Sequence, residues 1–109
     1  MIYLAGPYSH TNPRVREARF DATCQSPADL FRAVQPVFAP IVMGHRLIPY
    51  DLPGDWSFWQ PLATEYLRRC DELVVLQLDG WRESEGVQAE MALAAALGKR
   101  VGYLIEERS

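Results

Sequence analysis

Short apolar runs alternate with stretches of helical periodicity along this chain. The helical stretches repeat apolar residues three and four positions apart, whereas the runs are short and rich in branched aliphatic residues. We predict strands over residues 2–5, 36–42, 73–78 and 101–105, and helices over residues 12–33, 59–69 and 84–98. The third run, Leu-Val-Val-Leu-Gln-Leu, is typical of a strand covered on both faces.

Capping and turn residues mark the ends of these elements. Asn12 and Pro13 suit the N-cap and the first position of a helix, and Gly98 suits the C-terminal end of another. The dipeptide Ser26-Pro27 predicts a kink or a restart in the first helix. Residues 44–57 show no periodicity, and so long a connection in a small domain is usually functional or lid-like.

Strands that alternate with helices predict a parallel sheet with right-handed crossovers. We therefore expect an α/β fold, with a small doubly wound, flavodoxin- or Rossmann-like sheet of four to five strands flanked by helices. At 109 residues the chain should form a single domain over residues 1–109. Ligands bind such sheets beyond the carboxyl ends of the strands, so residues 6–9 and 79–86 should meet at one site.

Glu90 lies in the middle of an apolar helix face. At about 100° per residue, the segment 86–98 puts apolar side chains on one arc of roughly 160°, with Glu90 at its centre. A buried carboxylate is unfavourable unless it is paired, hydrogen-bonded or neutralised. Glu90 is therefore either a residue used in chemistry or a carboxylate bonded to a buried Tyr or a backbone amide, and the convergence of the two loops favours chemistry.

The two loops contain further candidates for ligand binding. Ser84 is a natural N-cap, and the same hydroxyl, together with Gly86 and the free amides of a helix N-terminus, would suit a phosphate. In the turn after the first strand, Gly6, Pro7 and Tyr8 lack the further glycines of a dinucleotide-binding motif. Tyr8 either stacks on a planar base or packs within its loop.

Four more residues are considered on weaker grounds. Arg14 is one of three arginines near a helix N-terminus, of which one is a candidate for the anion site. Trp59 and Trp56 flank the long connection, where one of them stacks on a base or both pack in the core. His45 has no second ligand at metal spacing, so we expect no metal and no cofactor.

Composition excludes several classes of partner. The net charge of −3 argues against binding to a nucleic acid polymer. No apolar run reaches membrane-spanning length and no basic segment precedes one at the N-terminus, so we expect a cytoplasmic protein without membrane contact. Cys24 and Cys70 form no close-spaced pair, and we expect both to be small core residues in a reducing compartment.

Three segments resemble the nucleoside 2-deoxyribosyltransferase superfamily, in particular its nucleoside 5′-monophosphate N-glycosidase branch and small bacterial members of unassigned function. They are Ile2-Tyr3-Leu4-Ala5-Gly6-Pro7-Tyr8, Cys70-Asp71-Glu72-Leu73-Val74-Val75-Leu76 and Gly80-Trp81-Arg82-Glu83-Ser84-Glu85-Gly86-Val87-Gln88-Ala89-Glu90. The resemblance spans nearly the whole chain in order and spacing, and Ser-x-Gly-x-x-x-Glu is its most specific element.

The resemblance implies a role for each matching residue. Glu90 matches the nucleophile that attacks the anomeric carbon and forms a glycosyl-enzyme, and Tyr3 matches the tyrosine that orients it. Ser84 matches the serine of the monophosphate hydrolases, where the transferases carry an Asp for the sugar 5′-hydroxyl. A hydroxyl at a helix N-terminus favours a phosphate and a carboxylate repels one, so we expect a nucleoside 5′-monophosphate rather than a nucleoside.

The chain departs from this family at Ala63, where the family usually carries an Asp close to the base and sugar. Helix phase places Ala63 on an inward arc with Tyr66, but alanine cannot donate a proton to a leaving base. Either Thr64, Glu65 or another group substitutes, or the chain is a weakened or disabled form that still binds ligand.

We therefore expect a hydrolase that cleaves the N-glycosidic bond of a nucleoside 5′-monophosphate by double displacement, with water as the final acceptor. A nucleoside deoxyribosyltransferase is the first alternative. A nucleotide-binding or sensing module without catalysis is the second, and Ala63 favours it. Because relatives complete their pockets with a neighbouring subunit, we expect a homodimer or a higher homo-oligomer. The base, and ribose or 2′-deoxyribose, stay open.

Overall fold

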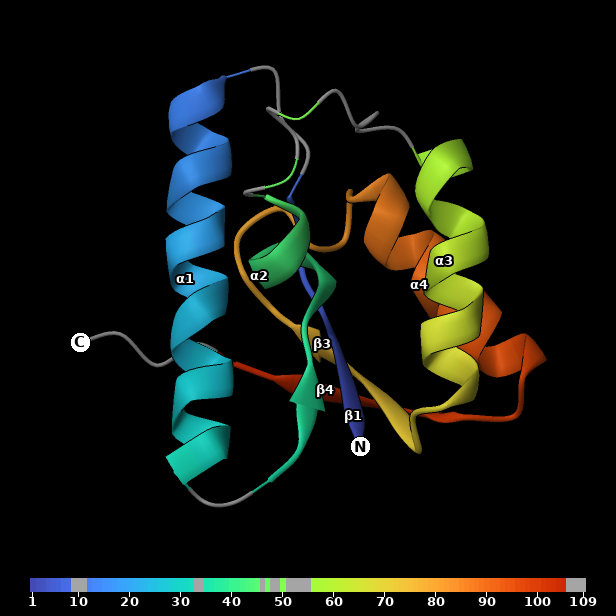
Figure 1. Cartoon of the computed structure of the whole chain (residues 1–109). Helices are drawn as coiled ribbons and strands as arrows, with labels where there is room; N and C mark the ends of the chain where they lie inside the picture. Colours follow the sequence, from blue (N-terminus) through green and yellow to red (C-terminus); the bar gives the residue numbers. More distant parts are fainter. Residues whose placement is uncertain (9–11, 33–34, 46, 48–49, 51–55, 106–109) are drawn as a thin grey trace.

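A computed structural model of the chain describes residues 1–8, 12–32, 35–45, 47, 50 and 56–105 (Figure 1). Strands and helices alternate along most of the chain, as the hydrophobic pattern predicts. The elements are β1 (Ile2–Ala5), α1 (Pro13–Arg32), β2 (Val37–Phe38), α2 (Pro40–Gly44), α3 (Trp56–Arg68), β3 (Glu72–Leu76), α4 (Glu85–Ala96) and β4 (Arg100–Leu104).

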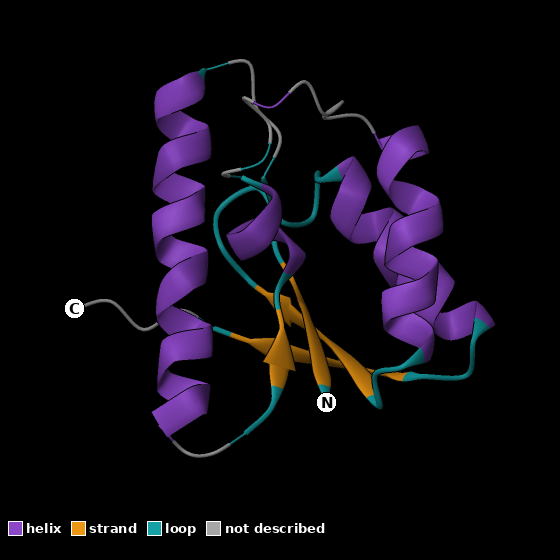
Figure 2. Ribbon diagram, viewed as in Figure 1, coloured by secondary structure: helices purple, strands orange, loops and turns teal. Residues whose placement is uncertain are grey.

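The described strands form one parallel sheet in the order β2-β1-β3-β4 (Figure 2). Its centre is the pair β1 and β3, which are in register from Ile2 opposite Glu72 to Ala5 opposite Val75. The carboxyl ends of these two strands are therefore adjacent, and the chain leaves both at the same edge of the sheet. This confirms the predicted α/β class and places the loops after β1 and β3 together.

Helices cover both faces of the sheet, with α1 and α2 on one face and α3 and α4 on the other (Figure 1). Alternation along the strands supplies a core to each face. Tyr3 and Ala5 pack on the α3–α4 side, in a cluster that includes Ala63 and Val87. Leu4 packs on the opposite side, in a second cluster with Leu76, Leu78 and Ala22. Glu90 is on α4 and Tyr3 is on β1, so the first cluster brings them together.

The structure confirms two of the predicted helix N-caps. The side-chain Oδ1 of Asn12 accepts a hydrogen bond from the backbone N–H of Arg14 at 2.9 Å, at the start of α1. The Oγ of Ser84 accepts one from the backbone N–H of Val87 at 3.2 Å, at the start of α4. Helix α1 continues without a restart through residues 26–27. Just beyond the other end of α4, Gly98 adopts a φ of +70°. This left-handed conformation often ends a helix and favours glycine.

The predicted strand over residues 36–42 is wrong beyond Phe38. Only Val37 and Phe38 pair with β1, and Pro40 begins the short helix α2. Proline has no N–H to offer a sheet but suits the first turn of a helix, where that N–H would be unpaired. Periodicity alone could not separate the two, because an apolar run of this length fits a strand or a buried helical turn. Helix α2 matters because Pro40, Ile41 and Gly44 line the cavity described below.

Smaller differences concern element ends. Helix α3 begins at Trp56, three residues before the predicted start, while β3 and β4 each begin one residue earlier than predicted and end before the predicted strand end. Such shifts are usual at element ends. None of the helices in the described part of the chain is long and apolar enough to cross a membrane.

Candidate active site

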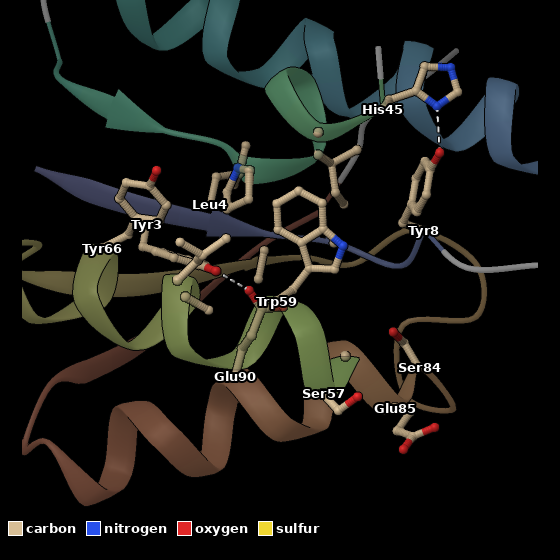
Figure 3. Close-up of a pocket in the computed structure, with 18 of the residues that line it drawn as sticks. Tyr3, Leu4, Tyr8, His45, Ser57, Trp59, Tyr66, Ser84, Glu85 and Glu90 are labelled. Carbon is tan, nitrogen blue, oxygen red and sulfur yellow. Dashed lines mark hydrogen bonds between the residues drawn. The ribbon is translucent and has the colours of Figure 1, made fainter. Parts of the chain in front are cut away.

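A cavity of about 670 Å³ opens where the loops after β1 and β3 meet (Figure 3). Its walls come from β1, α2, α3 and the start of α4. Most of the residues predicted from the sequence line it: Tyr3, Gly6, Tyr8, His45, Trp59, Ala63, Ser84, Gly86 and Glu90. The volume is in the range of small-molecule sites. The cavity is therefore large enough for a small ligand, and its lining residues come from four separate elements.

Glu90 projects from α4 into this cavity, and the hydroxyl of Tyr3 donates a hydrogen bond to its Oε2 (Figure 3). Tyr3 is almost fully buried on β1, with 1% of its surface exposed. The bond explains how an apolar helix face accommodates a carboxylate. Tyr3 donates to Oε2 only, and no described residue donates a hydrogen bond to the second carboxylate oxygen, Oε1. Oε1 is therefore available for other chemistry.

The surroundings of this pair oppose ionisation. Desolvation by burial raises the pKa of the Glu90 carboxyl to about 7, although the hydrogen bond from Tyr3 acts in the opposite direction. Burial, together with the adjacent Glu90, also raises the pKa of Tyr3 above its usual range. Tyr3 therefore stays protonated and acts as a fixed donor, while Glu90 changes charge near neutral pH. A cavity carboxyl with so large a shift is a candidate catalytic group.

This shift makes the stability of the fold depend on pH. Folded Glu90 keeps its proton up to about pH 7, whereas a glutamate in the unfolded chain loses it near 4.5. Between these values the folded state binds more protons, so the free energy of unfolding falls as the pH rises through the window. Above the window the full cost of the buried charge is present.

Glu90→Gln should therefore stabilise the protein at high pH. Glutamine is neutral at every pH and keeps an oxygen that accepts the Tyr3 hydrogen bond. We expect the free energy of unfolding to rise by about 2 to 3 kcal/mol at about pH 8 and to change little at about pH 4. Urea denaturation at both pH values measures this. Glu83→Gln, at an exposed rim position, is the matched control; an equal gain for Glu90→Gln at both pH values would contradict the prediction.

The start of α4 forms another part of the cavity wall. Ser84 caps the helix, and the amides of Glu85 and Gly86 precede the first intrahelical hydrogen bonds. A Cβ on Gly86 would meet only the Oγ of Ser84, at 4.0 Å, so the glycine leaves the cavity open beside the helix end. The capping bond occupies an acceptor site of the Ser84 hydroxyl, whose proton remains available to a ligand.

The charges around this helix end are acidic. The exposed residues Glu83 and Glu85 line the cavity beside Ser84, and its described lining contains no Arg or Lys. In Figure 3 the Glu85 carboxylate points away from Trp59 and Glu90. An anion at this end would thus depend on the helix amides and dipole and on the Ser84 hydroxyl.

Ala63 faces the cavity as helix phase predicts, with 6% of its surface exposed. The polar groups of its two neighbours, Thr64 and Glu65, are bonded to other partners. The Thr64 hydroxyl donates to the Gln60 carbonyl oxygen at 2.8 Å, and Glu65 pairs with Arg69 at 2.7 Å and with Arg68. The hydrogen bond from Arg69 holds the pKa of the Glu65 carboxyl below its usual value. Glu65 is thus an exposed, ion-paired surface group and not a proton donor to this cavity.

A chain of polar contacts that the sequence did not predict lies at another wall of the cavity. The hydroxyl of Tyr8 is 2.6 Å from Nδ1 of His45, and Nε2 of His45 is 2.7 Å from Oε2 of Glu17 on α1. The His45 ring stacks on Phe20, with 4.3 Å between ring centroids. These residues are 28 and 37 positions apart in the sequence, so no local motif could have revealed the contacts.

Aromatic rings form the rest of the wall. Trp59 and Tyr66 project from α3 into the cavity, and Tyr66 packs on Phe38 with 4.3 Å between centroids. Tyr66 was predicted only as an inward residue of the helix, and Ser57 and Ile41 were not predicted at all. Helix α2 contributes Ile41, so the mistaken strand concealed its role. The side chain of Trp56 lies outside the described residues.

Two predicted binding residues do not line the cavity in the described part of the chain. Arg14 is exposed at the start of α1, which covers the opposite face of the sheet from α3 and α4. Pro7 is buried within the loop after β1, between two residues that do line the cavity. The described residues also hold no cluster of His, Cys, Asp or Glu side chains that would bind a metal ion.

Fold and cavity together define a small doubly wound α/β protein with a shielded carboxylate in a pocket at the carboxyl edge of its sheet. The chain belongs to the family described as a domain of unknown function (DUF1937), whose model matches residues 1–106. No curated protein shows significant similarity to the chain.

Proposed function

We propose that this protein cleaves the N-glycosidic bond of a nucleoside 5′-monophosphate, with Glu90 as the nucleophile. The observation that carries the proposal is the Tyr3–Glu90 pair at the wall of a cavity large enough for a nucleotide. The carboxylate attacks the anomeric carbon and forms a glycosyl-enzyme, which water then hydrolyses. The Tyr3 hydrogen bond fixes the attacking group in place, and the resemblance to the N-glycosidase branch supports the same role.

The other walls suit the remaining parts of such a substrate. The helix amides and the Ser84 hydroxyl provide donors for a 5′-phosphate. The aromatic side chains of Trp59 and Tyr66 provide flat apolar surfaces for a base. Each wall comes from a different element, so a nucleotide would link them across the cavity.

Two observations favour other functions. The carboxylates of Glu83 and Glu85 favour a ligand with an uncharged 5′ end, which makes a nucleoside, and with it a nucleoside deoxyribosyltransferase, the second candidate. Ala63 removes a carboxyl from the cavity wall and favours a module that binds nucleotides without cleaving them. Incubating the protein with ribo- and deoxyribonucleoside 5′-monophosphates and the corresponding nucleosides, and following free base by chromatography, separates these functions. Adding a second base as acceptor reveals transfer.

Ser84→Asp distinguishes a nucleotide site from a nucleoside site. Aspartate caps a helix as well as serine does, so the start of α4 is kept while a carboxylate is set beside the 5′ end. We expect nucleotide binding to weaken by about 2 kcal/mol or more, and nucleoside binding to change much less. Calorimetric titration of both ligands measures this. Equal losses for the two ligands would show that the phosphate binds elsewhere.

A further inference from the structure

The proposed cleavage needs a proton for the leaving base, and the position expected to supply it holds Ala63. Thr64 and Glu65 point their polar groups at other partners. The Tyr3 hydroxyl is committed to Glu90, and burial raises its pKa further from neutrality. Under the proposed function, on which this inference rests, another group in the cavity wall must therefore donate the proton to the base and then be reprotonated.

We propose that Tyr8 is the proton donor to the leaving base and that His45, held by Glu17, resupplies the proton that Tyr8 gives up. The contacts form a continuous line, with 2.6 Å from the Tyr8 hydroxyl to Nδ1 of His45 and 2.7 Å from Nε2 to the Glu17 carboxylate. Tyr8 and His45 both line the cavity. In Figure 3 the Tyr8–His45 pair and the Tyr3–Glu90 pair lie on either side of the Trp59 ring.

The local packing suits this relay. Stacking on Phe20 fixes the plane of the His45 imidazole, and its side chain is only 13% exposed. In the imidazolium form both ring nitrogens donate, with Nε2–H directed at the Glu17 carboxylate and Nδ1–H at the Tyr8 oxygen. With Nδ1–H donating to the Tyr8 oxygen, the Tyr8 proton is free to point into the cavity.

The relay also answers an objection to tyrosine as an acid. Burial raises the pKa of Tyr8, with Glu17 adding to the shift and Arg16 opposing it, so a free tyrosinate is unfavourable. A proton that arrives from His45 as another leaves toward the base prevents tyrosinate from accumulating. Tyr8 is thus the residue that touches substrate, and His45 is a positioning residue that acts through it.

The protons balance over the two half-reactions. As an oxygen of Glu90 bonds to C1′, the bond from C1′ to the base nitrogen breaks and its electron pair stays on the base. The base takes the Tyr8 proton, and the Tyr8 oxygen takes the Nδ1 proton of His45. Water then attacks C1′ and releases Glu90, and the proton it loses returns through Tyr8 to His45.

Leaving-group dependence tests the donor. One substrate is the nucleotide that the panel above identifies. The other is 4-nitrophenyl β-ribofuranoside 5-phosphate, or its 2-deoxy counterpart to match that nucleotide, whose nitrophenolate leaves without a proton. Tyr8→Phe keeps the ring and removes the hydroxyl, so we expect kcat to fall by about 10²-fold or more on the nucleotide and by only a few-fold on the nitrophenyl compound. Equal losses on both substrates, or none on either, would overturn the proposal.

A second variant tests the relay through the pH profile. His45→Gln keeps hydrogen-bonding ends but cannot store an exchangeable proton. We expect it to match Tyr8→Phe in its loss on the nucleotide and to abolish the alkaline limb of the kcat–pH profile. An alkaline limb that persists in His45→Gln would overturn the role of His45. The limb is measured on the nucleotide alone, so this test does not depend on the synthetic substrate.

Tyr66→Phe is the matched control, since it removes another hydroxyl from the lining of the same cavity. Whatever it does to binding, it should leave the ratio of the two rates as in the parent protein. If the parent protein releases neither base nor nitrophenolate, the proposed function fails and the relay fails with it. If the parent is active but the variants show no selective loss, the relay alone is refuted.

Discussion

Glu90→Gln is expected to abolish base release while leaving the fold intact. The amide keeps the size of the side chain and an oxygen for the Tyr3 hydroxyl, but it is not a competent nucleophile. Loss of a covalent nucleophile typically removes a factor of about 10⁴ or more in kcat. Single-turnover assays with the cleaved nucleotide measure the loss, and calorimetric titration shows whether binding survives.

Glu83→Gln is the matched control for this loss, because it makes the same chemical change at an exposed position of the same cavity. We expect its kcat to stay within about tenfold of the parent value, as for removal of a solvated charge away from the reacting atoms. Activity of Glu90→Gln within a few-fold of the parent would refute the assignment of the nucleophile. Two equally impaired variants would point to the overall charge of the cavity instead.

The sheet was predictable because each strand is marked by an apolar run in its own short stretch of sequence. Apolar runs define β1, β3 and β4 to within one or two residues, and alternation with helices determines their parallel arrangement. The Tyr3–Glu90 contact was predictable in part, because a carboxylate on an apolar face requires a partner and the family resemblance named one. The exception was β2, where an apolar run concealed the helical start at Pro40.

The Tyr8–His45–Glu17 contacts could not be predicted in the same way. They join the loop after β1, the end of α2 and the first turns of α1. Each residue alone is unremarkable in its local sequence, and the contact depends on how α1 and α2 pack on the same face of the sheet. The same packing leaves Arg14 exposed at the start of α1, outside the residues that line the cavity. The arrangement of the candidate site therefore depends on tertiary packing as much as on local motifs.

Ala63→Asp is the other substitution with a large expected effect. Position 63 is buried on α3, lines the cavity and packs in the same cluster as Tyr3. A carboxyl there would share a desolvated site with Glu90, and coupling between two such groups raises one pKa. A raised pKa is what a proton donor at neutral pH requires, and a general acid contributes about 10²- to 10⁴-fold.

The size of the gain depends on whether the chain already has a donor, so the substitution is made in two backgrounds. With Tyr8 supplying the proton, we expect Ala63→Asp to add less than about tenfold to the parent protein and to restore about 10²-fold to Tyr8→Phe. Ala63→Asn, which has nearly the same shape but no acidic proton, should restore neither. Initial rates of base release measure all of the variants, and thermal unfolding identifies those that fail to fold.

A gain of about 10²-fold in the parent itself would mean that the natural alanine is a catalytic lesion and that Tyr8 gives no proton. If every form binds nucleotide tightly and none releases base, the nucleotide-binding module is the correct function.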